Sequence, residues 1–442
     1  MQVTLQEILS AREERAKLQR ELLAKHGAPL ISFTMNIAGP IKTSAEIERA
    51  FDDGLYLIER FICRFEVLER IIKKEKCGPV AIFSVRAGAK GLKRLATYTE
   101  EEYCPIGRLF DIDVIDTDGT HLSRENERGC LVCGAPGRAC AAGRLHPVSQ
   151  IVEKTNEMLT DYVTKRDSNL ASYLARVALE LEVNTYPKPG LVDPVSAGSH
   201  IDLTVSDFMK SAEMITPFFG NFFKEGARSR GSSGDELFSA LRAVGLDVER
   251  RMYAETNGKN THKGAIFSFG IIIGALGRLM RPDGVIPPTE DILKEAARIS
   301  KKALSDELFA ARGATAGERA YIELGIRGVR GEAMDGFPSV QNIALPVYRA
   351  AIAEGKSKND AGVLTLLYLI ANVYDTCIYS RGGSSGIEYA MSYARRLIEG
   401  GEPTVEQIEE MDREFIKRNL SPGGCADLLA ITYFLYELET CD

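Results

Sequence analysis

The feature that most constrains the fold of this chain is a change of sequence pattern near residue 150. Before it, short runs rich in β-branched and aromatic residues, at 79–85 and 109–115, predict buried strands between helical segments. From Ser149 onward, long apolar stretches with helical spacing alternate with loops rich in Gly or Pro. We therefore predict two domains: an α+β domain over residues 1–166 and an all-α helical domain over residues 168–442.

Local signals indicate where the helices begin and end. Thr4 and Glu7 form a capping box that opens a helix ending near Gly27. Apolar residues at helical spacing predict one long helix over 47–72. The charged, capping-type stretch at 166–168 separates two helical patterns, so we expect a new helix to open there.

Composition excludes several classes of protein. The chain has 442 residues, 45% hydrophobic and 26% charged, as in ordinary globular proteins, and its net charge is -7. An acidic chain lacks the positive face of a general nucleic-acid binder. The longest uncharged stretches, 264–277 and 361–374, are shorter than the ~20 residues of a membrane span. With a polar N-terminal segment and nine cysteines, an odd number, we expect a cytoplasmic protein that binds neither nucleic acid nor membrane.

The strand predicted at 109–115 carries the clearest candidate chemistry of the first domain. Side chains alternate between the two faces of a strand, so Asp111 and Asp113 share one face. Two adjacent carboxylates repel each other unless a cation lies between them, and Mg²⁺ is held by one or two carboxylates together with substrate phosphates. The pair predicts metal-assisted phosphoryl or nucleotidyl transfer in a nucleotidyltransferase-like domain. The alternative is an exposed strand face at the edge of a sheet.

A basic run lies between the two predicted strands. Its cations alternate with glycines and could cradle a polyphosphate, although a solvated basic loop is the commoner meaning of such a run. They are Arg86, Lys90, Lys93 and Arg94.

Three cysteines and a histidine lie within 17 residues: Cys130, Cys133, Cys140 and His146. Thiolate and imidazole groups are the ligands of tetrahedral zinc sites, and the set contains a C-x-x-C pair. The spacing is not a standard finger pattern, so buried free thiols or a redox-labile pair remain alternatives to zinc.

Two carboxylates of the second domain are expected on buried helix faces. The first helix of that domain carries an apolar stripe, and Glu180 lies on it, whereas Glu182 faces away. The predicted stripe consists of Leu170, Tyr173, Leu174, Val177 and Leu181. Asp375 continues the apolar stripe of 364–371. A carboxylate on a core face needs a partner or a metal, and both of these flank Gly-rich loops, which favours a functional site. A buried pair with arginine is the alternative.

Polar loops of the second domain offer groups for phosphate. The segment 260–264 precedes the most apolar helix, whose N-terminus favours anions, and His262 and Lys263 add donors there. Arg327 and Arg330 lie among glycines and suit phosphate contact. Two further polar loops contain Arg381 and Asp427. A tight surface turn is the alternative for each loop.

The first domain contains a set of motifs that point to one family: Ser32-Phe33-Thr34, Gly39-Pro40-Ile41-Lys42, Pro105-Ile106-Gly107-Arg108-Leu109-Phe110-Asp111-Ile112-Asp113-Val114, Ser123-Arg124, and Cys130-Leu131-Val132-Cys133 through Cys140 to His146. With them, residues 1 to about 165 resemble the holo-acyl-carrier-protein synthase of citrate lyase. The resemblance implies transfer of a phosphoribosyl-dephospho-CoA group to a serine of the apo acyl carrier subunit, with release of pyrophosphate. The resemblance also implies that Arg108 is a catalytic residue, together with Asp111 and Asp113.

The second domain carries its own set of motifs: Glu182-Val183-Asn184, Pro187-Lys188-Pro189-Gly190-Leu191-Val192-Asp193, Ser196-x-Gly198-x-His200-x-Asp202, Asn260-Thr261-His262-Lys263-Gly264, Arg330-Gly331-Glu332, Asp375-Thr376, Ser380-Arg381-Gly382-Gly383, and Arg418-Asn419-Leu420-Ser421-Pro422-Gly423-Gly424 with Asp427. From about residue 168 to the end, the chain resembles triphosphoribosyl-dephospho-CoA synthase. The resemblance implies that the 2′-hydroxyl of 3′-dephospho-CoA attacks C1′ of the ATP ribose, that adenine leaves, and that Mg²⁺ accompanies the triphosphate.

The residue patterns, among them the helix stripe that carries Glu180, and the resemblance together predict roles for single residues of this domain. Expected to be catalytic are Glu180, Asp193 and Asp375. Expected to bind substrate or phosphate are Lys188, His200, Asp202, His262, Lys263, Arg327, Arg330, Arg381 and Asp427. His200 and His262 are candidates for phosphate or base roles, and a satisfied structural histidine is the equal alternative for each.

Together the two resemblances predict a bifunctional enzyme that makes and attaches the citrate lyase prosthetic group. The two reactions are consecutive, so joining them in one chain raises the local concentration of the intermediate at the second site. The equivalent pathway for malonate decarboxylase is one alternative. A non-catalytic, zinc-bearing scaffold that binds nucleotides is the other.

Overall fold

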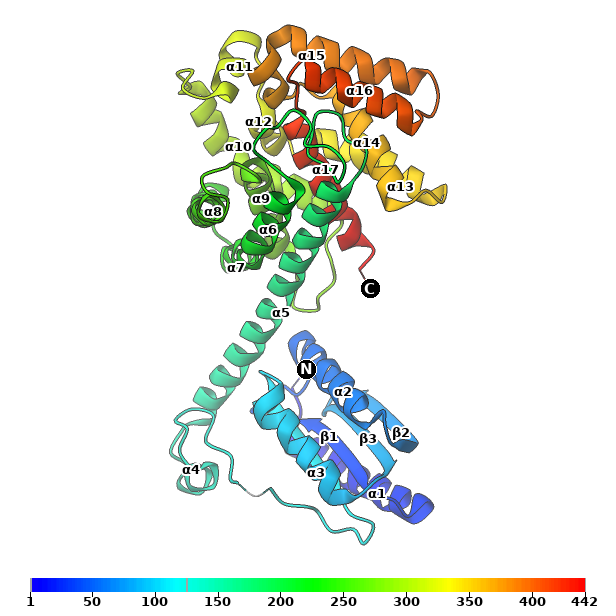
Figure 1. The fold of residues 1–442 in the computed structure, drawn as a ribbon. Helices are drawn as coiled ribbons and strands as arrows, with labels where there is room; N and C mark the ends of the chain where they lie inside the picture. The colour runs from blue at the N-terminus through cyan, green and yellow to red at the C-terminus, as the bar shows by residue number, and fades with distance from the viewer. Residues whose placement is uncertain (1, 125, 442) are drawn as a thin grey trace. The chain divides into compact units, whose positions relative to one another are not determined.

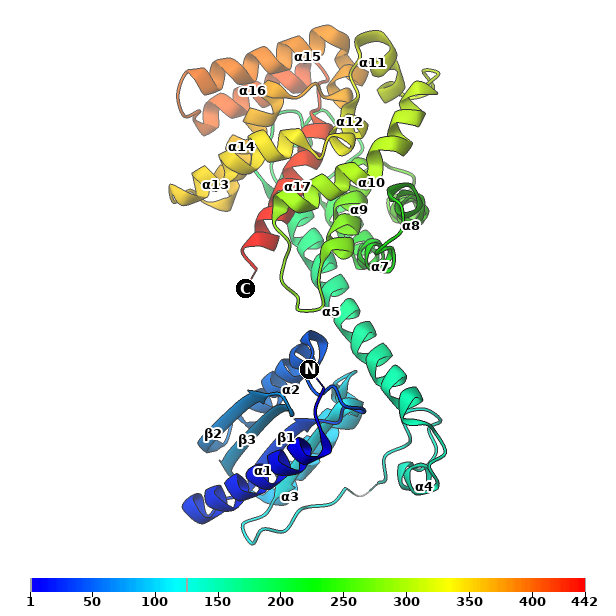
Figure 2. The ribbon, with the colours of Figure 1, turned by 180° about the vertical axis from the view of Figure 1, so that it is seen from behind.

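The computed structural model describes residues 2–124 and 126–441, and the chain divides into two compact units, Met1–Lys165 and Arg166–Asp442 (Figures 1 and 2). Helix α5 (Val148–Asn184) contains residues of both units. The helix start expected at 166–168 is therefore wrong. This helix of 37 residues contains neither glycine nor proline, so a charged stretch with one serine does not interrupt it.

The first unit contains a four-stranded antiparallel sheet in the order β2-β3-β1-β4. Its strands are β1 (Leu30–Met35), β2 (Glu66–Glu75), β3 (Gly78–Arg86) and β4 (Phe110–Ile115). The strands predicted at 79–85 and 109–115 correspond to β3 and β4, and both predictions are confirmed.

The long helix predicted over 47–72 ends early. Helix α2 (Ala45–Ile62) takes the first part of that range and strand β2 the second. Strand β2 turns directly into β3 at Gly78, whose φ of 109° suits glycine. Ile71 and Ile72 pair with Ile82 and Ala81 of β3. Cross-strand pairing of β-branched side chains therefore overrides a spacing that also fits a helix.

Helices cover both faces of the sheet in the first unit. Helix α1 (Leu5–His26) lies in front of the sheet in Figure 2, opens with the predicted capping box, and packs Leu22 against Leu30 of β1. Helices α2 and α3 (Ala89–Tyr98) cover the other face, where Phe33 stacks on Phe51 with ring centroids 4.7 Å apart. The remaining elements are a π-helical turn (Thr99–Tyr103), a 3₁₀ turn (Gly107–Leu109) and α4 (Gly137–Gly143).

The second unit is mostly helical, as predicted. Beyond the end of α5 its helices are α6 (Val205–Ile215), α7 (Gly220–Arg228), α8 (Gly234–Glu255), α9 (Lys263–Leu279), α10 (Thr289–Phe309), α11 (Ala316–Leu324), α12 (Gly328–Met334), α13 (Leu345–Ala353), α14 (Lys358–Asn372), α15 (Thr376–Glu399), α16 (Val405–Lys417) and α17 (Gly423–Glu439). Two short turns, Thr216–Phe218 and Val340–Ala344, complete it.

The core of the second unit lies around α9 and α17, the two helices that begin at the candidate site (Figure 1). The rings of Phe269 in α9 and Phe434 in α17 meet edge to face, with centroids 5.4 Å apart. Helices α7 and α9 approach each other closely at Gly277. A Cβ atom at this position would lie 2.1 Å from the carbonyl oxygen of Phe223, so there is no room for a side chain. This close packing fixes α7, α9 and α17 relative to one another.

Among the described residues, no single helix is long and apolar enough to cross a bilayer. Only α14 and α15 taken together reach that length and composition, and they meet at an angle of 53°.

Candidate active sites

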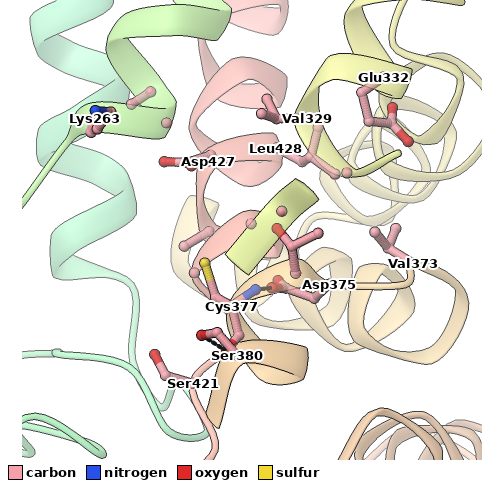
Figure 3. Close-up of a pocket in the computed structure, with 18 of the residues that line it drawn as sticks. Lys263, Val329, Glu332, Val373, Asp375, Cys377, Ser380, Ser421, Asp427 and Leu428 are labelled. Carbon is pink, nitrogen blue, oxygen red and sulfur yellow. Dashed lines mark hydrogen bonds between the residues drawn. The ribbon is translucent and has the colours of Figure 1, made fainter. Parts of the chain in front are cut away.

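The second unit contains a cavity of about 1220 Å³ at the starts of α9, α15 and α17 (Figure 3). Loops that are far apart in the sequence meet around it. Its lining includes most of the residues predicted for this domain: Lys188, His200, Asp202, His262, Lys263, Arg327, Asp375, Arg381 and Asp427. Glu180, Asp193 and Arg330 lie outside the described lining.

The prediction that Glu180 faces the core and Glu182 faces away is wrong. Glu182 lines the cavity, and its Oε1 accepts a hydrogen bond of 2.6 Å from the ammonium of Lys188. The two side chains are 9% and 1% exposed, so this is a buried ion pair. Glu180 pairs instead with Arg176 on the outer side of α5, and Tyr173, which was expected in the core, is 63% exposed. The apolar stripe is thus rotated from the predicted one. It runs through Leu174, Ala178, Leu179 and Val183, and reading these residues as the stripe would have identified Glu182.

Asp193 and Arg330 do not line the cavity and contact other residues instead. Asp193 Oδ1 accepts hydrogen bonds from the backbone N–H groups of Val195 and Ser196, and Oδ2 accepts one from that of Lys188. Asp193 therefore shapes the loop that presents Lys188. Arg330 lies 3.7 Å from Glu307, away from the cavity lining.

Asp375 is a buried carboxylate whose partners are backbone groups rather than an arginine. It caps α15 by accepting from the N–H of Cys377 at 2.7 Å, and it accepts from the N–H of Cys425 in α17 at 2.8 Å. Burial raises the pKa of Asp375, while these N–H groups act in the opposite direction. The side chain ties the first turns of two helices together at the wall of the cavity.

Asp427 projects from α17 toward the start of α9, where Lys263 lies (Figure 3). It accepts a hydrogen bond from the N–H of Ala265, so one free N–H group of this helix start is already occupied. Burial raises the pKa of Asp427 well above its usual range, and the negative charges of Glu182 and Asp375 add to that shift. A Cβ atom at Gly264 would lie 1.9 Å from Oδ2 of Asp427, which explains the glycine at that position.

Both predicted histidines line the cavity, each within hydrogen-bond distance of a serine hydroxyl. His262 is buried, its Nδ1 lies 2.9 Å from Oγ of Ser211, and its Nε2 has no partner among the described residues. Burial lowers the pKa of His262 to about 3, and the charge of Lys188 acts in the same direction. His200 Nε2 lies 3.1 Å from Oγ of Ser421, and its pKa is lowered by burial and by Arg381.

The predicted cations of the cavity differ in their freedom to meet a ligand. Arg381 is held by the carbonyl oxygen of Ser199 and by Oδ1 of Asn419, each at 2.8 Å. Lys263 lies 3.2 Å from Glu249, and Arg327 pairs with Asp335. The cavity therefore offers positive groups on flexible side chains beside a compact set of carboxylates.

The first unit places Asp111 and Asp113 on one face of β4, as predicted from strand periodicity. In the register of the sheet they stand opposite Thr34 and Ser32 of β1. Burial raises the pKa of Asp113, and the charge of Asp111 raises it further. The two carboxylates are thus electrostatically coupled on the face that α1 covers. Asp111 lines a cavity of about 200 Å³ between α1 and the sheet.

Arg108 and the basic run lie apart from that cavity lining. Arg108 donates a hydrogen bond of 2.6 Å to the carbonyl oxygen of Gly129, so it fixes a loop. In the basic run, Lys93 donates to the carbonyl oxygen of Ile112 at 3.2 Å, and Arg86 pairs with Glu66.

A buried carboxylate that the sequence analysis missed lies next to β4. Glu100 accepts from the N–H of Ile112 at 2.8 Å and forms ion pairs of 2.7 Å with Arg124 and Arg128. Burial raises the pKa of Glu100 to about 7. Glu100 holds the edge strand β4 in place, and its position at the start of the acidic run 100–102 gave no signal of burial.

The Cys/His motif forms a compact cluster. The ligand atoms of Cys130, Cys133, Cys140 and His146 all lie within 4.8 Å of one another, and the Sγ atoms of Cys133 and Cys140 are 3.4 Å apart. Three soft sulfur ligands and one imidazole nitrogen at this separation fit the donor set of a tetrahedral zinc site.

Two family models match the chain, one in each half. The model of the apo-citrate lyase phosphoribosyl-dephospho-CoA transferase family, CitX, matches residues 3–162. The model of the ATP:dephospho-CoA triphosphoribosyl transferase family, CitG, matches residues 168–442.

Curated relatives contain the same two regions in one chain. The protein CitXG of Haemophilus influenzae is 33% identical over 452 residues, which cover 98% of this chain and 96% of the relative. The protein CitXG of Leuconostoc mesenteroides subsp. cremoris is 33% identical over 99% of this chain and 97% of its own. A 2-(5″-triphosphoribosyl)-3′-dephosphocoenzyme-A synthase of Pectobacterium atrosepticum is 41% identical over 60% of this chain and 87% of its own.

Proposed function

Because the chain belongs to the CitXG family, in which an apo-citrate lyase phosphoribosyl-dephospho-CoA transferase region precedes an ATP:dephospho-CoA triphosphoribosyl transferase region, we propose that it makes and attaches the citrate lyase prosthetic group. The second unit joins ATP to 3′-dephospho-CoA and releases adenine. The first unit then transfers the product to a serine of the apo acyl carrier subunit and releases pyrophosphate. The observation that carries this proposal is the large cavity of the second unit, where carboxylates and cations converge from helices and loops that are distant in the sequence.

In the second unit, the 2′-hydroxyl of dephospho-CoA replaces adenine at C1′ of the ATP ribose. A transition state of this kind carries positive charge on the sugar, which buried carboxylates stabilise. Glu182 lines the cavity, and Asp427 and Asp375 place two further carboxyl groups there. Burial raises the pKa of both, so a cationic group in the cavity would favour their charged forms. We therefore assign to Glu182 the catalytic role that was expected for Glu180.

The triphosphate needs positive partners in the same cavity. Lys263, Arg327 and Arg381 line it and supply them. Neutral His262 offers an unpartnered Nε2 for a hydrogen bond to the substrate. The carboxylate of Asp427 is an oxygen donor of the kind that Mg²⁺ prefers, and Mg²⁺ there would neutralise phosphate charge.

In the first unit, the carrier serine displaces pyrophosphate from the α-phosphorus of the triphosphate, as in a nucleotidyltransferase. Asp111 and Asp113 share one face of β4, and the negative charge of Asp111 raises the pKa of Asp113. A cation between the two carboxylates would relieve this repulsion. Their oxygens fit Mg²⁺, which when bound would polarise the phosphoryl oxygens. Arg108 acts by holding the loop at Gly129 rather than by touching the cavity.

The Cys/His cluster is proposed as a structural zinc site of the first unit. Four ligands close the coordination sphere, so zinc there would stabilise the loop that precedes α5 and would leave no open position for substrate. The cluster needs reduced cysteines, as the cytoplasm provides, and a cytoplasmic location suits the ATP and dephospho-CoA substrates.

The two activities are proposed to be separable at residues 166–168. Every candidate residue of each reaction lies on one side of that stretch. A fragment over 168–442 should release adenine, and one over 1–166 should load the carrier when the precursor is supplied. Because α5 continues through the boundary, a fragment that retains the whole of α5 is the control for loss of helix stability. A folded fragment that regains activity only with the other piece would show a shared site instead.

Adenine release tests the proposal against its alternatives. The purified chain, ATP and dephospho-CoA should yield adenine, and the apo carrier of citrate lyase should then gain the prosthetic group while that of malonate decarboxylase does not. A non-catalytic scaffold would release no adenine. Preferential loading of the malonate decarboxylase carrier would assign the chain to the other pathway.

A further inference from the structure

The first unit has a small cavity between α1 and the face of the sheet that carries Asp111. Its volume is about 200 Å³, below the ~300–1,000 Å³ of a typical small-molecule site. It therefore fits a part of a nucleotide-like substrate rather than the whole molecule. Arg12 and Arg15, one turn apart on α1, line one wall, and Lys42 from the loop after β1 lines another. In Figure 2, α1 lies in front of the sheet, over this face.

Arg12, Arg15 and Lys42 have no carboxylate partner within ion-pair distance among the described residues. Lys42 donates instead to the carbonyl oxygen of Ile37. Burial lowers the pKa of Lys42, and the nearby charge of Arg12 lowers it further, so two like charges face the same space. Arg15 lines the same cavity as Asp111, and its positive charge partly offsets the rise that burial and Asp111 cause in the pKa of Asp113.

Other charges at the rim do not cancel this set. Lys73 also lines the cavity, but it lies 4.0 Å from Glu75 and is partly compensated. Glu14 also lines the cavity and is exposed, as Arg12 is, so one carboxylate faces the three cations besides Asp111. Positive side chains that face one another across a cavity, with an acidic residue at one end, form the pattern of a phosphate site completed by a metal ion.

We propose that Arg12, Arg15 and Lys42 bind the terminal phosphates of the triphosphoribosyl precursor, with Asp111 at the end of the cavity where the α-phosphate lies. This assignment rests on the transferase function proposed for the first unit. Arg12, Arg15 and Lys42 then neutralise the charge of the pyrophosphate as it leaves. The basic run at 86–94, which the sequence analysis considered as a phosphate cradle, has no part in this site.

A single-tryptophan reporter can test this site in the full chain. The chain contains no tryptophan, so Ile8→Trp at the wall of the cavity gives a fluorescence signal from this place alone. Inorganic tripolyphosphate with Mg²⁺ should change that signal saturably. Arg12→Gln and Arg15→Gln should each weaken tripolyphosphate binding by about tenfold, as expected for loss of a charge-assisted hydrogen bond. Lys17→Gln, on the same helix but 3.9 Å from Glu21 on its exposed side, is the matched control and should bind normally.

The outcomes separate this site from the proposed transferase function. A reporter chain that loads the carrier but shows no saturable signal would overturn the site and leave the function intact. Equal tripolyphosphate affinity in the Arg12→Gln, Arg15→Gln and Lys17→Gln chains would also overturn it. Normal tripolyphosphate binding in a chain that never loads a carrier would instead contradict the function and support an anion site.

Discussion

The buried ion pair between Glu182 and Lys188 decides which carboxylate of α5 belongs to the active site. In Glu182→Gln the new amide oxygen can still accept from Lys188, but the buried ammonium loses its counter-charge. Breaking a buried pair from one side costs about 3–5 kcal/mol, and the retained hydrogen bond places the expected loss near ~3 kcal/mol. Glu180→Gln is the matched control on the same helix. Its pair with Arg176 is partly exposed, at 30% and 45%, so the expected loss is about 0–1 kcal/mol.

Two assays read the effect of these variants. Urea unfolding followed by circular dichroism measures the stability of the helical unit, and adenine release measures its activity. Glu182→Gln should lose most adenine release under conditions where it is fully folded, while Glu180→Gln should behave as the unaltered chain. Both variants should load the carrier when the precursor is supplied, because the residues proposed for carrier loading lie in the first unit, whereas Glu180 and Glu182 lie in the second.

The reasoning would be refuted by the reverse order. If Glu180→Gln destabilised the helical unit as much as Glu182→Gln, the burial of the two side chains would not determine their contributions. If Glu182→Gln lost stability but kept full adenine release, Glu182 would be a structural residue and not part of the reaction.

Three further predictions concern other groups. Asp111→Asn should abolish carrier loading and leave adenine release unchanged, since only the first unit loses a metal ligand; normal loading would remove Asp111 from the mechanism. Protein purified under reducing conditions without chelator should contain about one zinc per chain, and Cys133→Ser should lose it; metal analysis without zinc would contradict the proposed site. Because burial lowers the pKa of His262 from 6.5 to about 3, only the unfolded chain gains a proton there between these pH values. The contribution of His262 to the free energy of unfolding is therefore complete above pH 6.5 and falls by about 1.4 kcal/mol per pH unit as the pH drops toward 3. An equally steep loss of stability in the His262→Asn chain would show that another group causes it.

Local patterns in the sequence were sufficient wherever short-range geometry determines structure. The alternation in 109–115 predicted that Asp111 and Asp113 share a face, because the period of a strand does not depend on its neighbours. The capping box at Thr4 was equally local. Most residues expected at a phosphate site do meet at one cavity, but Arg381 and Asp427, which were expected in loops, lie in α15 and α17.

Tertiary context explains the predictions that failed. The predicted apolar stripe of α5 lies on the wrong face of the helix. The aromatic Tyr173 was expected in the core but is exposed, whereas small alanines of α5 are buried against the neighbouring helices. Strand β2 could not be distinguished from a continued α2 until its pairing with β3 was known. The cavity at Arg12 and Lys42 joins a helix to a loop after the next strand, and no pattern within either segment indicates that they meet.

The intact mass of the acyl carrier subunit tests the central claim most directly. Apo carrier of citrate lyase, ATP, dephospho-CoA, Mg²⁺ and this chain alone should give a carrier heavier by one phosphoribosyl-dephospho-CoA group, with one adenine and one pyrophosphate released per carrier. Omission of dephospho-CoA should prevent both the mass change and adenine release. A carrier of unchanged mass in the complete mixture, with the same carrier loaded by another enzyme of the family as a positive control, would contradict the account.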